Sequence, residues 1–266
     1  ALPISLGSIN LTVVITSPAK GVIRVQTCHH AGMSAKSPAF ELNTSEDNMS
    51  VTETDELITI TSGDLSLEIT KLPWSMTYKH KGRVLSKSGR KDLALMKTDW
   101  KGYAYDKGDY TDTYIRQQLS MGVGELLYGF GERFTPFVKN GQSIDIFNQD
   151  GGTSTEQSYK NIPFYISNKG YGVFVNHPEK VSFEVGTEMV TKAEFSVEGS
   201  YLDYFFIDGP SMKDVLVKYT DLTGKPSLPA PWTFGLWLST SFTTNYDEKT
   251  VMSFIDGMLD RGIDRK

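Results

Sequence analysis

Apolar and polar side chains alternate with a period of two along most of the chain from residue 11 to residue 207. Clear examples are 65–69, 181–185 and 193–197, in which every second residue is apolar. Such alternation buries one face of a strand and leaves the other face in water. Polar runs such as Ser62-Gly63-Asp64 and Lys79-His80-Lys81-Gly82 predict turns between neighbouring segments, with the His80 side chain in solvent. Short alternating strands spaced by roughly 8–12 residues predict a mainly β protein, built as a sandwich.

The period changes to helical spacing in the segment 211–220. Ser211 followed three residues later by Asp214 is typical of a helix start, because both side chains can bond the free N–H groups of the first turn. We therefore predict a helix directly after the last strand. Prolines then interrupt residues 222–231, which predicts a linker.

Two further elements follow the linker. The apolar residues 234–238 predict a short strand, and 246–262 predict an amphipathic helix that ends at Gly262. A strand followed by a helix is half of a βαβ unit and cannot bury its own apolar face. We therefore expect residues 1–224 to form one domain, and residues 225–266 to be a linker and the start of an incomplete second domain.

Composition and charge argue against several classes of function. The 266 residues carry a formal net charge of −5, which argues against nucleic acid as a partner. The single cysteine, Cys28, excludes an internal disulfide framework and fits a reducing compartment. The N-terminal residues show no signal-peptide pattern, and no apolar run approaches the ~18 residues that span a bilayer. We expect a cytoplasmic protein with no membrane partner.

No cofactor or metal site is expected. His29 and His30 are adjacent, and adjacent residues of a strand point to opposite faces, so they cannot easily share a metal ion. The run 128–134 places two glycines around a phenylalanine but lacks the third glycine of the dinucleotide-binding fingerprint. A close approach of two strand backbones explains these glycines better.

The turn Asn148-Gln149-Asp150-Gly151-Gly152 follows a strand-like run, 143–147. Two glycines after an aspartate permit a sharp reversal of the chain. The carboxylate of Asp150 is then expected at the tip of an anchored loop. On these residues alone, a plain solvated hairpin end is the favoured interpretation, because Asp-Gly is a common hairpin signal.

Four stretches of the sequence resemble glycoside hydrolase family 31, and their motifs are most similar to its bacterial α-xylosidase branch. These stretches are 128–134, 148–165, 170–178 and 228–248. The resemblance covers most of the chain from about Tyr114 onward, whereas residues 1–110 match more loosely.

The resemblance implies a galactose-mutarotase-like β-sandwich followed by the first β-α unit of a truncated (β/α)8 barrel. It also implies a retaining exo-glycosidase, in which one aspartate attacks the anomeric carbon and a second protonates the leaving oxygen. In the family both aspartates lie on later barrel strands, so this chain is expected to hold no catalytic residue and to be inactive alone. Lys97-Thr98-Asp99 and Phe130-Gly131-Glu132-Arg133 are similar to parts of the nucleophile motif. They stand apart in a sandwich and are not expected to be catalytic.

Two substrate-binding residues follow from the resemblance. Asp150 is expected on a sandwich loop that reaches over the barrel mouth and accepts hydrogen bonds from sugar hydroxyls. Phe242 is expected to pack against the sugar near C5, which favours xylose because xylose lacks the C6 hydroxymethyl group. The implied partner is an oligosaccharide with a terminal α-xylose or α-glucose, and the implied full-length protein is a homo-oligomer. The family turn usually has Trp and Arg where this chain has Phe147 and Gln149.

Two other functions stay open on sequence grounds. A free-standing carbohydrate-binding sandwich would bind oligosaccharides alone, whereas half of a composite site would bind them weakly or not at all. A mutarotase-type epimerase needs a histidine and a glutamate as acid and base. None of the four histidines lies beside a motif carboxylate, which argues against it.

Overall fold

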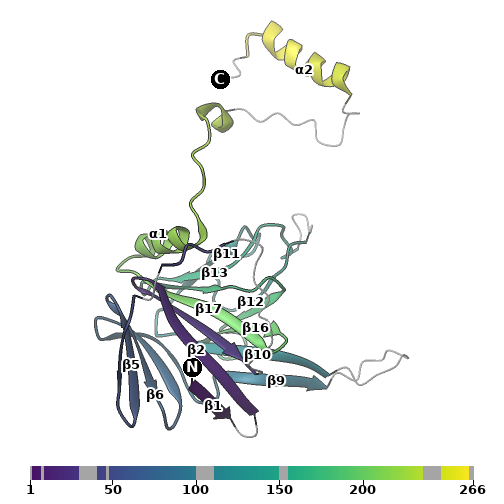
Figure 1. Cartoon of the computed structure of the whole chain (residues 1–266). Coiled ribbons are helices and arrows are strands. Elements are labelled where there is room, and N and C mark those ends of the chain that lie inside the picture. The colour runs from purple at the N-terminus through teal and green to yellow at the C-terminus, as the bar shows by residue number, and fades with distance from the viewer. Residues whose placement is uncertain are drawn as a thin grey trace. The chain divides into compact units, whose positions relative to one another are not determined.

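The computed structural model describes residues 2–6, 9–29, 41–45, 48–99, 111–149, 155–235 and 247–263 (Figure 1). The chain divides into two compact units, Ala1–Gly224 and Lys225–Lys266, and each is described by itself. Within the described ranges, no helix has the length and hydropathy needed to cross a membrane.

The described strands of the first unit form three antiparallel sheets. The largest sheet has the order β1 (Leu2–Leu6), β2 (Ile9–Ala19), β3 (Val22–Cys28), β17 (Tyr201–Asp208), β14 (Tyr171–Val175), β13 (Asn161–Ser167), β11 (Leu127–Gly131). The second has the order β12 (Gln142–Ile146), β15 (Val181–Val185), β16 (Lys192–Glu198), β10 (Thr111–Ser120), β9 (Leu93–Asp99). The third is a meander of β4 (Ser50–Glu53), β5 (Leu57–Ser62), β6 (Leu65–Thr70), β7 (Ser75–His80) and β8 (Arg83–Ser88).

The prediction of a mainly β sandwich is confirmed. In β6 and β15 every second residue is buried, as the alternation of the sequence requires. Strand β14 is buried at every position, because it lies between β13 and β17 inside the largest sheet. Side chains from all three sheets meet in one continuous apolar core.

Four tyrosines with side chains fully inside this core form a group that we call the buried tyrosine cluster. Its members are Tyr78, Tyr165, Tyr171 and Tyr204. The hydroxyls of Tyr78 and Tyr204 are hydrogen-bonded to each other at 2.8 Å, and Tyr171 donates to the carboxylate of Glu125 over 2.6 Å. Burial raises the pKa of all four tyrosines, because the core does not solvate the phenolate form.

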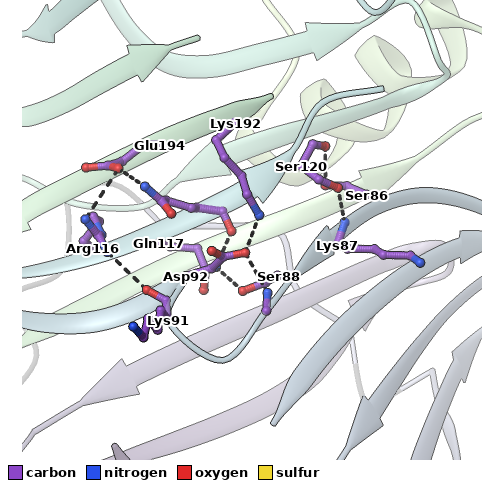
Figure 2. A network of polar contacts seen from close by, with 12 residues as sticks. Ser86, Lys87, Ser88, Lys91, Asp92, Arg116, Gln117, Ser120, Lys192 and Glu194 are labelled. Carbon is purple, nitrogen blue, oxygen red and sulfur yellow. Dashed lines mark hydrogen bonds and ion pairs between the residues drawn. The ribbon is translucent and has the colours of Figure 1, made fainter. Parts of the chain in front are cut away.

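Polar side chains join the third sheet to the second (Figure 2). Ser86 on β8 donates its hydroxyl to the backbone oxygen of Ser120 on β10 over 2.8 Å. The side-chain amide of Gln117, on the same strand β10, donates to the hydroxyl of Ser88 over 2.7 Å. These bonds satisfy buried polar groups where the chain passes from one sheet to the next.

The same network continues around two carboxylates (Figure 2). Asp92 accepts hydrogen bonds from the ammonium group of Lys192 and from the backbone N–H of Gly89. Glu194 accepts from the side-chain amide of Gln118 over 2.5 Å. Burial raises the pKa of Glu194, and the bond from Gln118 opposes this shift. Both carboxylates are thus satisfied by neighbouring strands, which gives the network a structural role.

The predicted helix after the last strand is confirmed as α1 (Met212–Thr223). Ser211 caps it, and Asp214 closes the capping box by accepting from the backbone N–H of Ser211. The ring of Tyr219 stacks on Phe164 of β13 with 3.9 Å between ring centroids. Helix α1 therefore packs on one face of the largest sheet, over β13, β14 and β17.

In the second unit the structure describes a 3₁₀ helix, η1 (Pro231–Phe234), and α2 (Glu248–Asp260). Asp247 caps α2 by accepting from the backbone N–H of Thr250, and Gly262 has the left-handed φ of +66° expected after a helix. The expectation of a strand beginning at Phe234 is wrong, because Phe234 ends a turn of helix that Pro231 opens. Residues 236–238 lie outside the described part, so a first β-α unit of a barrel is not established.

The prediction that His80 lies in a solvated turn is also wrong. Strand β7 continues through His80, and only Lys81 and Gly82 form the turn. The imidazole Nδ1 lies 2.8 and 2.9 Å from the two carboxylate oxygens of Asp208, whose side chain is 1% exposed. The pair connects β7 of the third sheet with β17 of the largest one.

Candidate functional site

Neither substrate-binding residue inferred from the resemblance can be placed. Asp150 and Phe242 lie outside the described residues. The structure does describe the chain on both sides of Asp150, up to Gln149 and again from Thr155. We call 145–149 the incoming stem and 155–160 the outgoing stem of this loop.

The two stems are paired with each other. Asn148 and Ser158 form a parallel β-bridge, and the backbone N–H of Gln149 donates to the oxygen of Ser158 over 3.0 Å. Before the bridge, β12 delivers the incoming stem with Ile144 and Ile146 buried in the core. The loop therefore starts from a strand that the core anchors.

Asn161 at the start of β13 lies between the stems. Its side-chain nitrogen lies 3.0 Å from the backbone oxygen of Phe147, 2.9 Å from the side-chain oxygen of Asn148, and 2.6 Å from the backbone oxygen of Ser158. Its backbone N–H also donates to the side-chain oxygen of Asn148 over 3.2 Å. One amide thus contacts both stems.

Arg133 reaches the same place from the turn after β11. Its guanidinium donates to backbone oxygens of Phe130 at 3.2 Å, Glu156 at 3.3 Å and Asp145 at 2.7 Å. It also donates to the side-chain oxygen of Asn161. Burial lowers the pKa of Arg133, and the charges of Asp145 and Glu156 oppose the shift. We call Arg133, Asn161 and these acceptors the loop base.

A tight bulge in β11 brings Arg133 to the loop base. Gly129, Phe130 and Gly131 all have left-handed φ values of +120°, +69° and +88°, and the register with β13 shifts between the two glycines. A Cβ atom on Gly131 would lie 1.9 Å from the backbone oxygen of Lys160. The expectation that these glycines allow two strand backbones to approach is therefore confirmed.

A polar pocket of about 580 Å³ opens beside the loop base. Among its lining residues are Arg133, Asp145, Gln149, Glu156 and Lys180. Lys180 pairs with Asp145 at 2.6 Å, so the charges largely compensate each other. Amides and carboxylates around an open pocket can donate to and accept from hydroxyl groups of a neutral, hydroxylated molecule.

A second hollow of about 640 Å³ lies on the other side of Phe147. It is lined by side chains of mixed character, including Phe147, Asn161, Phe174 and Tyr219. The ring of Phe147 is 54% exposed and borders both hollows. Among the residues that the structure describes, no group of three or more histidine, cysteine or acidic side chains is arranged to hold a metal ion.

Sequence reasoning did not find the roles of Arg133 and Asn161, although both lie in motifs that carry the resemblance. Their side chains are 28 positions apart in the sequence, and a pattern of neighbouring residues cannot predict a contact over that separation. The sequence feature that came nearest to predicting it is the glycine pair at 129 and 131. The neighbouring Glu132 forms an ion pair with Lys160 at 2.9 Å, in keeping with the sandwich setting expected for Phe130-Gly131-Glu132-Arg133.

Comparisons with known proteins agree on one family. Residues 12–184 match the model of the glycosyl hydrolase 31 N-terminal galactose mutarotase-like domain. An α-xylosidase of Emericella nidulans is 47% identical over 97% of this chain and 35% of its own length. The α-xylosidase XylQ of Lactiplantibacillus pentosus is 46% identical over 95% of this chain and 32% of its own length. The chain thus spans about a third of the length of these relatives.

Solved structures show the same fold at low sequence identity. The cycloalternan-forming enzyme from Listeria monocytogenes, in complex with a pentasaccharide substrate, superimposes with a TM-score of 0.79 at 24% identity. This match covers 97% of this chain and 24% of that one. Taken with the family match, which spans most of the first unit, these likenesses lead to one conclusion: the chain belongs to the glycosyl hydrolase 31 family through its N-terminal galactose mutarotase-like domain.

Proposed function

We propose that the chain is the N-terminal part of a retaining, exo-acting α-glycosidase that hydrolyses terminal α-xylosyl or α-glucosyl residues. The observation that carries this proposal is the identity of 47% and 46% with two α-xylosidases over almost the whole chain. Residues 1–224 act as the sandwich domain, and residues 225–266 are the linker and the start of a catalytic (β/α)8 barrel. The nucleophile and the acid–base residue lie on that barrel beyond Lys266, so the 266-residue chain alone has no activity.

In this proposal Asp150 binds substrate. Its carboxylate accepts hydrogen bonds from sugar hydroxyls, which a charged acceptor does more strongly than a neutral one. Support comes from the loop base, in which Arg133 and Asn161 hold both stems of the loop. The polar pocket beside Gln149 supplies further groups that suit a sugar.

Phe242 has the second role in this proposal, as an apolar wall near C5 of the bound sugar. Such a wall favours xylose over glucose by roughly 1–3 kcal/mol, because glucose carries an additional hydroxymethyl group. The natural partner is then an oligosaccharide with a terminal α-xylose or α-glucose. The single cysteine, which fits a reducing compartment, leads us to place the enzyme in the cytoplasm, and the motif resemblance leads us to propose a homo-oligomer for the full-length enzyme.

The proposal is tested by Asp150→Ala in the full-length enzyme, with an aryl α-xyloside as substrate. Loss of a hydrogen bond to a charged group costs about 1.5–3 kcal/mol, which corresponds to a fall in kcat/KM of roughly 10- to 100-fold. Asp64→Ala is the control, because Asp64 is an exposed aspartate on the hairpin between β5 and β6. An unchanged kcat/KM in Asp150→Ala, with the fold intact, would remove Asp150 from the site.

The alternative function, a free-standing carbohydrate-binding sandwich, is separated by calorimetry on the 266-residue chain. Xylose- and glucose-containing oligosaccharides are titrated into it. Half of a composite site is expected to give little or no heat of binding. A saturable titration with a simple stoichiometry would support the binding module instead.

A further inference from the structure

We infer that Arg133 and Asn161 are positioning residues for substrate binding. Neither needs to touch the sugar. Both fix the stems of the loop that carries Asp150, so the contact made by Asp150 depends on them. This inference rests on the proposed role of Asp150 and adds to it the residues that set where its loop stands.

Arg133 bonds to both stems at once. It donates to the backbone oxygen of Asp145 on the incoming stem over 2.7 Å, and to that of Glu156 on the outgoing stem over 3.3 Å. These acceptors are eleven positions apart along the chain. A single planar group therefore fixes the spacing of the two stems close to the paired residues Asn148 and Ser158.

Asn161 repeats this arrangement two residues further along each stem. Its side-chain nitrogen contacts the backbone oxygen of Phe147 on the incoming stem and that of Ser158 on the outgoing stem. Its side-chain oxygen accepts from Arg133, so the two clamps are joined. Displacement of either side chain removes bonds to both stems.

Apolar burial gives the stems little other support near the tip. Phe147, Asn148 and Gln149 are all exposed, with the ring of Phe147 54% accessible. The position of these residues thus depends more on hydrogen bonds than on packing, namely those of the loop base and the backbone bond from Gln149 to Ser158. Since a misplacement of about 1 Å can cost 100-fold in rate, loss of these bonds should be visible in kinetics.

Arginine is required at position 133 for its geometry. Its acceptors on the two stems and on Asn161 are three neutral oxygens. They bind to two different nitrogens of the guanidinium group. The guanidinium presents five N–H groups in a fixed plane, whereas lysine offers three from a single atom. Arg133→Lys therefore keeps the positive charge and loses the clamp.

The test is a double-mutant cycle in the full-length enzyme, with Arg133→Lys and Asp150→Ala alone and together. With an aryl α-xyloside, Arg133→Lys is expected to lower kcat/KM at least tenfold, mainly through a higher KM. In the Asp150→Ala background the same change is expected to alter kcat/KM less than twofold, because the contact that it positions is already absent. Equal losses in both backgrounds would overturn the inference.

Arg116→Lys is the matched control. Arg116 is a partly buried arginine on β10 that donates to the backbone oxygen of Lys91 over 3.1 Å, outside the loop base. It is expected to change thermal stability without changing KM. A rise in KM equal to that of Arg133→Lys would show a general effect of destabilisation and would also contradict the inference.

Asn161→Asp tests the same inference if Arg133→Lys does not fold. A carboxylate still accepts from Arg133 but can no longer donate to Phe147 and Ser158. Faster hydrogen exchange is expected at the backbone N–H of Gln149, together with the same rise in KM. Unchanged exchange and KM would overturn the inference. If Asp150→Ala alone leaves kcat/KM unchanged, the proposed function fails first, which distinguishes the two failures.

Discussion

Replacement of Gly131 by alanine tests whether the bulge in β11 is needed to hold the loop base. A Cβ at this position would lie 1.9 Å from the backbone oxygen of Lys160 and 3.0 Å from the backbone nitrogen of Ile162. Backbone atoms cannot rotate away as a side chain can, so β13 must move at its first residues. That movement breaks the bond from the N–H of Glu132 to the oxygen of Lys160, now 2.9 Å long.

The expected cost has two parts. A left-handed φ costs an alanine about 1–2 kcal/mol, and loss of the hydrogen bond adds about 0.5–1.5 kcal/mol. We expect Gly131→Ala to lower the free energy of unfolding by about 1.5–3.5 kcal/mol. For a domain of this size each kcal/mol lowers Tm by roughly 2–4 °C, so the expected fall in Tm is about 3–14 °C.

Gly141→Ala is the control that carries the backbone cost alone, so the difference between the two variants measures the cost of the steric clash. Gly141 has a similar φ of +80°, but a Cβ there would meet nothing within 4 Å. Only the backbone term applies, so a loss of about 1–2 kcal/mol is expected. Urea unfolding followed by circular dichroism measures both variants. If Gly131→Ala is no more destabilising than Gly141→Ala, the close approach of the two strands is not needed and the reasoning is wrong.

Three further outcomes are expected. Ser211→Ala removes the cap of α1 and should cost about 1 kcal/mol in urea unfolding, whereas an unchanged midpoint would deny the capping box a role. Asp208→Asn takes the carboxylate away from His80 and should cost about 1–3 kcal/mol in a thermal melt, and an unaltered Tm would contradict this. Burial raises the pKa of the buried tyrosine cluster, so the unfolded chain releases these protons first and stability falls as pH rises beyond about 10. Phenolate absorbance from these four residues should then appear only as the circular dichroism signal is lost, and ionisation with the fold intact would refute it.

Much of the fold could be predicted from the sequence, because a strand with one buried face shows alternating apolar and polar residues. Strand β15 is an example, with apolar residues at each buried position. Strand β8 was not predicted, since its Arg-Val-Leu-Ser-Lys-Ser sequence buries Leu85, Ser86 and Ser88 and does not alternate. The buried hydroxyls of Ser86 and Ser88 form hydrogen bonds with β10, and the local sequence of β8 does not predict that partner.

The candidate site was less predictable, for a related reason. The glycines of the Gly129-Phe130-Gly131 bulge indicated a close backbone approach, because few other residues tolerate it. The contact between Arg133 and Asn161 depends on the register of β11 against β13, which the bulge itself shifts. Likewise, His80 reaches Asp208 because β7 continues two residues past the expected end of the strand at Tyr78.

The most direct test of the account is the hydrolysis of an aryl α-xyloside by two proteins, the full-length enzyme and the 266-residue chain. Turnover is expected from the full-length enzyme and not from the chain alone, because we propose that the nucleophile and the acid–base carboxylate lie on a barrel that the 266 residues do not include. Turnover by the isolated chain, at any rate above that of a heat-denatured sample, would contradict it.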